Sequence, residues 1–341
     1  MNTPRILTVG TANPPTRFTQ AEVLELAGYS DDRRRAFFLH SGIEGRYLAI
    51  ERGVFSPTES VDELQARFRK ASVDLGARAL TAALAEGGRT PGELDFLATT
   101  TCTGRLCPSL DTLIIRELGL RSDIQRVHVG DTGCASAMVA IQQAHNHLRA
   151  FPDHLAAVVA IEVSSVGYYL DDDLETAVAN AIFADGAGAA LLACAGAGPR
   201  IVATRTLLRS EHLDLMGFTF PGGRQRILLS KDIRHIATEM IAEWTEVALK
   251  AHGLRRTDIR HWVLHSAGQR VLERAQRDLG FSDADLEAPR AVLRRYGNMS
   301  SATVLFVLRE VFESRAPAPD DWGVMLALGP GFAAEGALLR W

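Results

Sequence analysis

Cysteine is scarce in this chain, and its few cysteines are not spaced like metal ligands or disulfide partners. The 341 residues include Cys102, Cys107, Cys134 and Cys194, with no Cys-x-x-Cys pair and no cluster of histidines beside them. Structural zinc sites and small disulfide frameworks use closely and regularly spaced cysteines. We therefore expect no metal site and no disulfide framework, and the unpaired thiols favour the reduced cytoplasm.

Long apolar runs and an excess of basic residues are also missing. The apolar segments are too short to span a bilayer, and the first residues lack the basic start and apolar core of a secretory signal. Lys and Arg number 37 against 41 Asp and Glu, which gives a net charge of −4. Bulk electrostatics therefore gives no reason to expect a nucleic acid partner, and we expect no membrane partner.

Short apolar runs and helical patterns alternate along the chain. The run His154–Glu162 is typical of a buried strand, and residues 109–119 have helical spacing that Gly119 closes. Residues 182–194 are interpreted as a strand, a glycine turn and a second strand. Because 341 residues can bury a large core, this alternation predicts an α/β fold built in layers.

The segment AGAGPR at 195–200 is the best candidate linker, so we expect an N-terminal half at 1–195 and a C-terminal half at 196–341. Each half has a strand, a turn and a helix that carry a reactive-looking residue. This pattern indicates an internal duplication that is too diverged to be seen as a sequence repeat.

The string GDTGCASAM places Cys134 where a glycine turn leads into a helix with an apolar face. The N-terminus of a helix carries partial positive charge and free N–H groups, which stabilise a thiolate. The pattern therefore predicts a reactive cysteine with a lowered pKa. A buried, inert cysteine is the alternative for such a residue taken alone.

Two further residues stand at similar points of the chain. His265 follows Cys134 by 131 residues, and Asn298 follows His265 by another 33, each where an apolar strand or turn leads into a helix. Such points converge on a crevice in α/β sheets. A thiol, an imidazole and an amide together form a known catalytic set. Taken singly, the histidine could be a satisfied core residue and the asparagine a turn residue.

Papain-like hydrolases also have a cysteine, a histidine and an asparagine at comparable spacing. Their cysteine lies near the mature N-terminus in a CGSCW-like context, whereas here 133 residues precede Cys134 and the context is DTGCASA. The hydrolase interpretation is therefore the weakest of the catalytic ones.

Several strings resemble the chalcone and stilbene synthase family, the type III polyketide synthases. They are GDTGCASAM, FADGAGAALL, LHSAG, LGPGF and above all YGNMSSATVLFVL, and the resemblance continues through GIEGRYLA and TCTGRLCPSLD. It covers nearly the whole chain and points to the bacterial branch. It implies a thiolase-like fold with two similar halves in α-β-α-β-α layers, and a homodimer.

The resemblance also implies an acyltransferase chemistry. Cys134 matches the nucleophile that takes an acyl group from a CoA thioester, and His265 matches the residue that activates this thiol. Asn298 matches its partner in the oxyanion pocket. Malonyl-CoA then loses CO2, its enolate extends the acyl chain, and the chain cyclises. The CoA thioesters are substrates, and neither a metal nor a redox cofactor is implied.

Two kinds of product are considered, and the first is favoured over its close rival. A fatty acyl starter would give an alkylpyrone or alkylresorcinol-like product, whereas malonyl units alone would give a small aromatic product. An enzyme like ketoacyl synthase III, which performs a single condensation or acyl transfer, is an alternative. A non-catalytic subunit of a biosynthetic complex is another.

Other positions match residues that shape the substrate pocket in the family. Phe183 matches a phenylalanine that gates the pocket, and Ile227 aligns loosely with a second gate. Arg46 matches a basic residue at the CoA entrance. Cys102 and Gly167 fall where relatives have side chains that line the cavity.

Two loops complete these expectations. Gly329, Pro330 and Gly331 match the loop that shapes the cyclisation pocket near the cysteine. The family has two glycines soon after the histidine, whereas here Ser266 and Ala267 precede Gly268. We expect this loop to guide the pantetheine arm along a path of its own.

Overall fold

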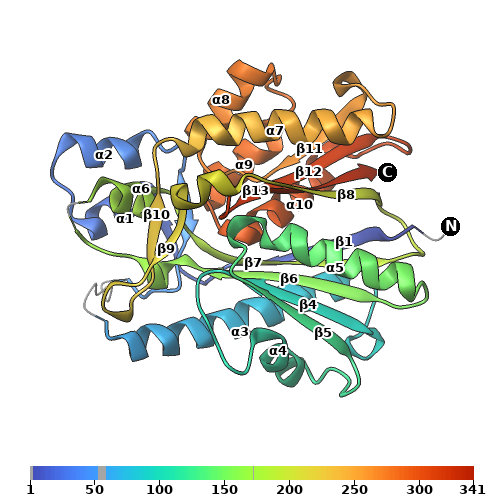
Figure 1. The fold of residues 1–341 in the computed structure, drawn as a ribbon. Coiled ribbons are helices and arrows are strands. Elements are labelled where there is room, and N and C mark those ends of the chain that lie inside the picture. The colour runs from blue at the N-terminus through green and yellow to red at the C-terminus, as the bar shows by residue number, and fades with distance from the viewer. Residues whose placement is uncertain (1–2, 53–58, 172) are drawn as a thin grey trace.

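The computed structural model describes residues 3–52, 59–171 and 173–341 (Figure 1). The N-terminal half contains strands β1 Arg5–Ala12, β2 Arg17–Thr19, β3 Gly45–Tyr47, β4 Phe96–Thr101, β5 Gln125–Gly130, β6 Ala156–Val163 and β7 Asp185–Ala193. Its helices are α1 Gln20–Ala27, α2 Asp32–Leu39, α3 Val61–Glu86, α4 Leu110–Leu118, α5 Ser136–Ala150 and α6 Leu174–Ile182.

The C-terminal half repeats much of this order. Its strands are β8 Arg200–Leu208, β9 Met216–Thr219, β10 Arg226–Leu229, β11 Ile259–Leu264, β12 Trp322–Gly329 and β13 Ala333–Arg340. Its helices are α7 Ile233–Lys250, α8 Gln269–Leu279, α9 Glu287–Tyr296 and α10 Thr303–Arg315.

Local sequence explains where these elements begin and end. Helix α3 begins with a capping box, in which the Ser60 hydroxyl accepts from the Glu63 N–H at 3.2 Å and the Glu63 carboxylate accepts from the Ser60 N–H at 2.7 Å. Helix α4 ends at Gly119, whose φ of 59° is the left-handed conformation that glycine adopts without steric cost. The predicted helix closed by Gly119 is therefore confirmed.

Strand order shows the duplication directly. The large sheet has the order β11-β12-β13-β8-β1-β7-β6-β4-β5, and β1 meets β8 at the single register pair Arg5 and Arg200. Outward from this seam, β1-β7-β6-β4 on one side corresponds to β8-β13-β12-β11 on the other. The predicted boundary between residues 195 and 196 falls in the connection from β7 to β8; that the halves are separate units stays a prediction.

Helices form three layers around the two parts of the sheet. In Figure 1, α3 and α4 lie below the N-terminal strands, α7 and α8 lie above the C-terminal strands, and α5 and α10 lie between. A core cluster joins buried residues of α5 and α10 to strands of both halves, and separate clusters lie under the outer helices. The predicted α/β architecture, with thiolase-like α-β-α-β-α layers, is confirmed.

One expectation about this sheet is wrong. Residues 182–194 do not form a strand, a turn and a strand, because β7 runs through Gly186 and Gly188 without interruption. A Cβ atom at Gly188 would lie 2.8 Å from Cβ of Leu305 on α10. The glycine therefore allows close packing of the central helix on the sheet, and it does not mark a turn. The sequence analysis also does not predict helix α9.

Gly10 provides a test of how tightly the layers pack. A Cβ atom there would lie 2.3 Å from both the Ala79 carbonyl oxygen and the Ala83 nitrogen on α3, and a helix backbone cannot yield as a flexible side chain can. We expect Gly10→Ala to lower the free energy of unfolding by about 3 kcal/mol in chemical denaturation.

Gly92→Ala is the matched control, because nothing lies within 4 Å of a Cβ atom there. Its free energy of unfolding should stay within about 0.5 kcal/mol of wild type. Equal stability of the two variants would show that β1 and α3 are not packed this closely.

Candidate active site

One large cavity brings together the three residues predicted to carry the chemistry. Its volume is about 760 Å³, and Cys134, His265 and Asn298 all line its wall. They come from three different segments: the turn before α5, the residue directly after β11, and the turn between α9 and α10. The structure thus places side chains that are far apart in sequence around one space.

Cys134 lies in the short helical turn Gly133–Ala135 that leads into α5, as the sequence predicts. Gly133 has a φ of 56°, and a Cβ atom there would lie 2.1 Å from Cδ of Pro330, so only glycine fits. The Cys134 Sγ lies 3.2 Å from the Ser300 Oγ. Ser300 belongs to the turn that leads into the other central helix, so this contact joins the two halves.

The predicted lowered pKa of Cys134 is wrong for the isolated thiol. Burial raises its pKa to about 12, and the hydrogen bond with Ser300 offsets this only in part. The turn places the thiol before the first residue of α5 in a largely apolar cavity. Loss of hydration outweighs the partial positive charge of the helix end.

His265, which the sequence predicts to activate this thiol, lines the same cavity. Its backbone N–H donates to the Leu326 carbonyl at 2.9 Å, which fixes it at the end of β11. The side chain is 8% exposed, and neither ring nitrogen has a hydrogen-bond partner among the described residues. Burial lowers the pKa of His265 to about 4, so the ring is neutral near pH 7 and can accept a proton.

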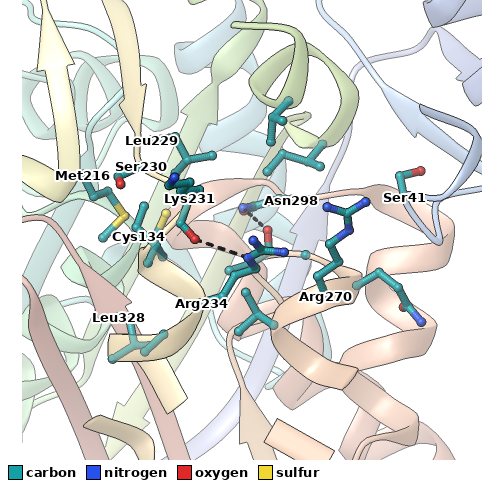
Figure 2. A pocket seen from close by; sticks show the side chains of 18 of the residues that line it. Ser41, Cys134, Met216, Leu229, Ser230, Lys231, Arg234, Arg270, Asn298 and Leu328 are labelled. Carbon is teal, nitrogen blue, oxygen red and sulfur yellow. Dashed lines mark hydrogen bonds between the residues drawn. The ribbon is translucent and has the colours of Figure 1, made fainter. Parts of the chain in front are cut away.

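A hydrogen-bond network fixes the Asn298 amide. Its Oδ1 accepts from the Ser300 N–H at 2.8 Å, and its Nδ2 donates to the Ala267 carbonyl at 3.1 Å (Figure 2). An amide nitrogen has two hydrogens, so one remains to donate to a substrate oxygen. Ala267 is two residues from His265, so this contact joins Asn298 to the loop that follows the histidine.

A second, much smaller cavity adjoins the first. Its volume is about 40 Å³, and four residues line both cavities and so form their common boundary: Cys134, Phe183, Met216 and Leu229. Of the residues that the sequence places at the substrate pocket, four more line the small cavity: Cys102, Gly167, Ile227 and Pro330. Phe183 stands at the boundary, which is the position that a gate requires.

Cys102 and Cys134 both contact the Ser300 hydroxyl. The Cys102 Sγ lies 3.1 Å from the Ser300 Oγ, and the Cys102 backbone N–H donates to the buried Glu162 carboxylate at 3.1 Å. Burial, together with the Glu162 charge, raises the pKa of Cys102 well above its usual range. Cys102 is thus a neutral thiol that lines the small cavity. It directly follows β4, just as His265 directly follows β11, the equivalent strand of the other half.

The loop at 329–331 mainly packs against the turn that carries Cys134, and only part of it lines a cavity. A Cβ atom at Gly329 would lie 2.5 Å from the Thr132 carbonyl oxygen, so the loop packs against the turn that carries Cys134. Of the three residues, only Pro330 lines a described cavity. Gly268 lines the large cavity, as expected of the loop after His265.

Arg46 is not at the CoA entrance, which corrects the sequence interpretation. Its side chain is fully buried, and its Nη1 donates to the Phe183 carbonyl at 2.6 Å. Arg46 belongs to the short strand β3 and lies in the interior beside the Phe183 backbone, not at the surface. Burial lowers the pKa of the guanidinium.

Sequence reasoning missed the basic side chains that line the large cavity, which are Arg33, Lys231, Arg234 and Arg270. In Figure 2, Arg270 and Ser41 lie at the side of the cavity opposite Cys134 and Met216. The basic runs RRR at 33–35 and KDIR at 231–234 were the available signal. Nothing in the sequence alone shows that these runs meet.

Comparisons with known proteins identify two matching family models and several relatives. A family model described as "Chalcone and stilbene synthases, C-terminal domain" matches residues 202–341, and one described as "FAE1/Type III polyketide synthase-like protein" matches residues 45–207. The chain is 34% identical to 3,5-dihydroxyphenylacetyl-CoA synthase of Amycolatopsis orientalis, over 99% of this chain and 93% of that protein.

Two further relatives extend the comparison. The 1,3,6,8-tetrahydroxynaphthalene synthase of Streptomyces peucetius subsp. caesius is 32% identical over 98% of this chain and 93% of its own. The crystal structure of PKS-I from the brown alga Ectocarpus siliculosus superposes with a TM-score of 0.92 at 30% identity, covering 99% of this chain and 98% of the other.

The chain therefore belongs to the chalcone and stilbene synthase family, the type III polyketide synthases. The activity class predicted from the sequence, a polyketide synthase that transfers acyl groups with decarboxylating condensation, is confirmed at the level of the family. In the described part of the chain, no helix is both long and apolar enough to cross a membrane.

The opposite pKa shifts of Cys134 and His265 allow a test of whether the imidazole takes the proton of the thiol. Each charge alone is costly in this cavity, so a thiolate forms near neutral pH only if moving one proton from the thiol to the imidazole creates an ion pair whose attraction offsets that cost. We expect wild-type Cys134 to react with iodoacetamide with a midpoint below about pH 8.

His265→Gln removes the proton acceptor and leaves only the burial that raises the thiol pKa to about 12. Alkylation in this variant should be slow at neutral pH and should still be rising at pH 10. A wild-type midpoint at or above the ordinary thiol value of about 8.5 would show that no ion pair forms.

Proposed function

We propose that Cys134 carries the growing acyl chain, that His265 is its base, and that His265 and Asn298 hold the thioester oxygen of malonyl-CoA. The observation behind this assignment is that the three line one cavity with donors and acceptors unused. Both His265 nitrogens lack partners in the described structure, and one Asn298 N–H is free of the Ala267 contact. A buried polar group without a partner is costly, which favours a ligand atom between them.

The loading step transfers an acyl group from CoA to sulfur. His265 takes the Cys134 proton, the thiolate attacks the thioester carbonyl, and the bond to the CoA sulfur breaks as that sulfur accepts a proton. The product is an acyl-Cys134 thioester and free CoA, with His265 neutral again.

The extension step forms a carbon–carbon bond. Malonyl-CoA releases CO2 as the bond between its carboxylate carbon and the central carbon breaks. The electron pair of this bond moves onto the thioester oxygen, where the His265 and Asn298 donors stabilise the resulting enolate. The enolate carbon attacks the acyl-Cys134 carbonyl, and the Cys134 sulfur leaves. The chain, now two carbons longer, is on CoA and can return to Cys134 or cyclise. No step calls for a cofactor.

The basic residues of the large cavity fit a CoA substrate. Phosphates of CoA are anionic, and Arg33, Lys231, Arg234 and Arg270 supply positive charge around a cavity that is otherwise mostly apolar. We propose that the nucleotide end binds near Arg270, on the side away from Cys134, so that the pantetheine arm can extend toward the thiol (Figure 2).

The small cavity favours a short starter, as for the small aromatic type of product. One water molecule needs about 10–15 Å³, so about 40 Å³ holds roughly three waters or a few carbon atoms. A long fatty acyl chain on Cys134 would not fit there. Malonyl-CoA alone, or with acetyl-CoA, is therefore the proposed source of carbon.

A homodimer is proposed from the free edge of the sheet. Strand β5 pairs only with β4 among the described strands, so one side of its backbone is unpaired. Soluble proteins rarely leave such an edge uncovered. A second copy of this chain placed along β5 would cover it.

Incubation with a panel of acyl-CoA starters and labelled malonyl-CoA, read by mass spectrometry, tests the proposed activity. We expect products from malonyl-CoA alone or with acetyl-CoA, and CO2 released with each condensation. Cys134→Ala should give none, because the anchor of the chain is gone. Condensation by Cys134→Ala would refute the assignment, and preference for palmitoyl-CoA would refute the short starter.

The amide of Asn298 has its own test. Asn298→Ala removes a donor to the enolate, so malonyl-CoA decarboxylation should fall by about 10²-fold or more. Transfer of the starter to Cys134, followed by mass spectrometry of the intact protein, should fall much less. Equal losses in both steps would contradict a specific role in decarboxylation.

A further inference from the structure

Arg46 is a buried cation with an unusual set of contacts. Its side chain is 0% exposed, and no ion pair to a carboxylate is found for it among the described residues. Its Nε and Nη2 atoms also lack hydrogen-bond partners in the described structure. Both oxygens of nearby Asp185 already accept from backbone N–H groups, those of Ala49 and Ser165. A buried charge held this way is costly, so its contacts require an explanation.

The contacts that Arg46 does make converge on the gate. Its Nη1 donates to the Phe183 carbonyl at 2.6 Å and contacts the Tyr168 hydroxyl at 3.4 Å. The Tyr168 hydroxyl itself donates to the same carbonyl at 2.6 Å. Two donors therefore fix one oxygen, and this oxygen belongs to the residue whose ring lines both cavities.

The same backbone segment holds Asn298. The Asn298 N–H donates to the Ile182 carbonyl at 2.9 Å, and the Ala184 N–H donates to the Asn298 carbonyl at 2.8 Å, so the two segments form a short parallel bridge. Phe183 is the middle residue of this bridge. Any displacement of its carbonyl therefore shifts both the gate and the residue that carries the catalytic amide.

Arg46 also touches the other side of this bridge. Gly297 has a φ of 72°, and a Cβ atom there would lie 3.4 Å from Cβ of Arg46 and 3.1 Å from the Ile182 carbonyl oxygen. The backbone before Asn298 is thus packed directly against the arginine. Arg46 thus lies against both segments of the bridge, at the Phe183 carbonyl and at Gly297.

We propose that Arg46 is a positioning residue for decarboxylation, which holds the Phe183 carbonyl and through it the bridge to Asn298. This inference rests on the role proposed for Asn298. It explains why a cation is retained in this position without a carboxylate partner. A neutral side chain could fill the space, but it could not donate to the Phe183 oxygen.

Arg46→Met tests the proposal, because methionine fills most of the volume and removes the donor and the charge. We expect malonyl-CoA decarboxylation to fall by about tenfold or more, since small displacements of catalytic groups are costly. Alkylation of Cys134 by iodoacetamide should stay within about twofold of wild type. Arg46→Lys retains a donor, and we expect it to recover part of the decarboxylation rate.

A matched control separates positioning from stability. Arg67 is another partly buried arginine, which pairs with Glu59 and contacts Ser165. Arg67→Met should lower the melting temperature with no change in the ratio of decarboxylation to alkylation. If Arg46→Met loses both rates in proportion, or keeps decarboxylation within about twofold of wild type, the proposal is overturned.

Two further variants keep the test decisive. If Arg46→Met does not fold, Tyr168→Phe removes the other donor to the Phe183 oxygen; a selective loss of decarboxylation supports the proposal, and an unchanged ratio overturns it. Asn298→Ala is measured alongside. If Asn298→Ala keeps decarboxylation, the proposed function of the amide fails; if it loses decarboxylation while Arg46→Met does not, only this inference fails.

Discussion

The site depends on the contact between two turns, one from each half of the chain. The turn Gly133–Ala135 leads into α5, the turn Ser300–Ala302 leads into α10, and the two turns lie against each other at the centre of the molecule. Gly133 also leaves room for Pro330, so the loop at 329–331 packs against the first of these turns. Because both central helices are buried in one core cluster, the turns cannot move apart without breaking that core. The cavity that holds Cys134 and Asn298 follows from this packing.

Burial keeps the resting site neutral. It raises the pKa of Cys134 to about 12 and lowers that of His265 to about 4, and both shifts oppose charge. In the proposed mechanism a charge forms only where a partner can stabilise it: the thiolate beside an imidazolium, and the enolate beside two donors. The same low polarity strengthens each of these interactions once it forms. Fixed donors in a poorly hydrated cavity are what a decarboxylating condensation needs.

The sequence predicted these features unevenly, for physical reasons. The sequence allowed us to predict that Cys134, His265 and Asn298 lie together, because each is part of a short motif next to the end of a helix or strand. Arg46 was misplaced because its burial depends on Phe183 and Gly297, which only the fold brings beside it. Gly186 and Gly188 were interpreted as a turn because a sequence does not show that α10 packs on β7. The pKa predicted for the isolated Cys134 thiol was wrong in direction, because loss of hydration depends on the entire cavity wall.

Duplication explains why the site has these members and no symmetric copies of them. His265 follows β11 and Cys102 follows the equivalent β4, while Cys134 and Ser300 stand in the two equivalent turns before the central helices. Ser300 contacts both thiols, at 3.1 Å and 3.2 Å. A second nucleophile at the equivalent position would compete for the same acyl group. Divergence at equivalent positions instead gives one proposed nucleophile and one proposed base, with a neutral thiol and a hydroxyl in the other two places, so the duplicated frame can supply an asymmetric reaction centre.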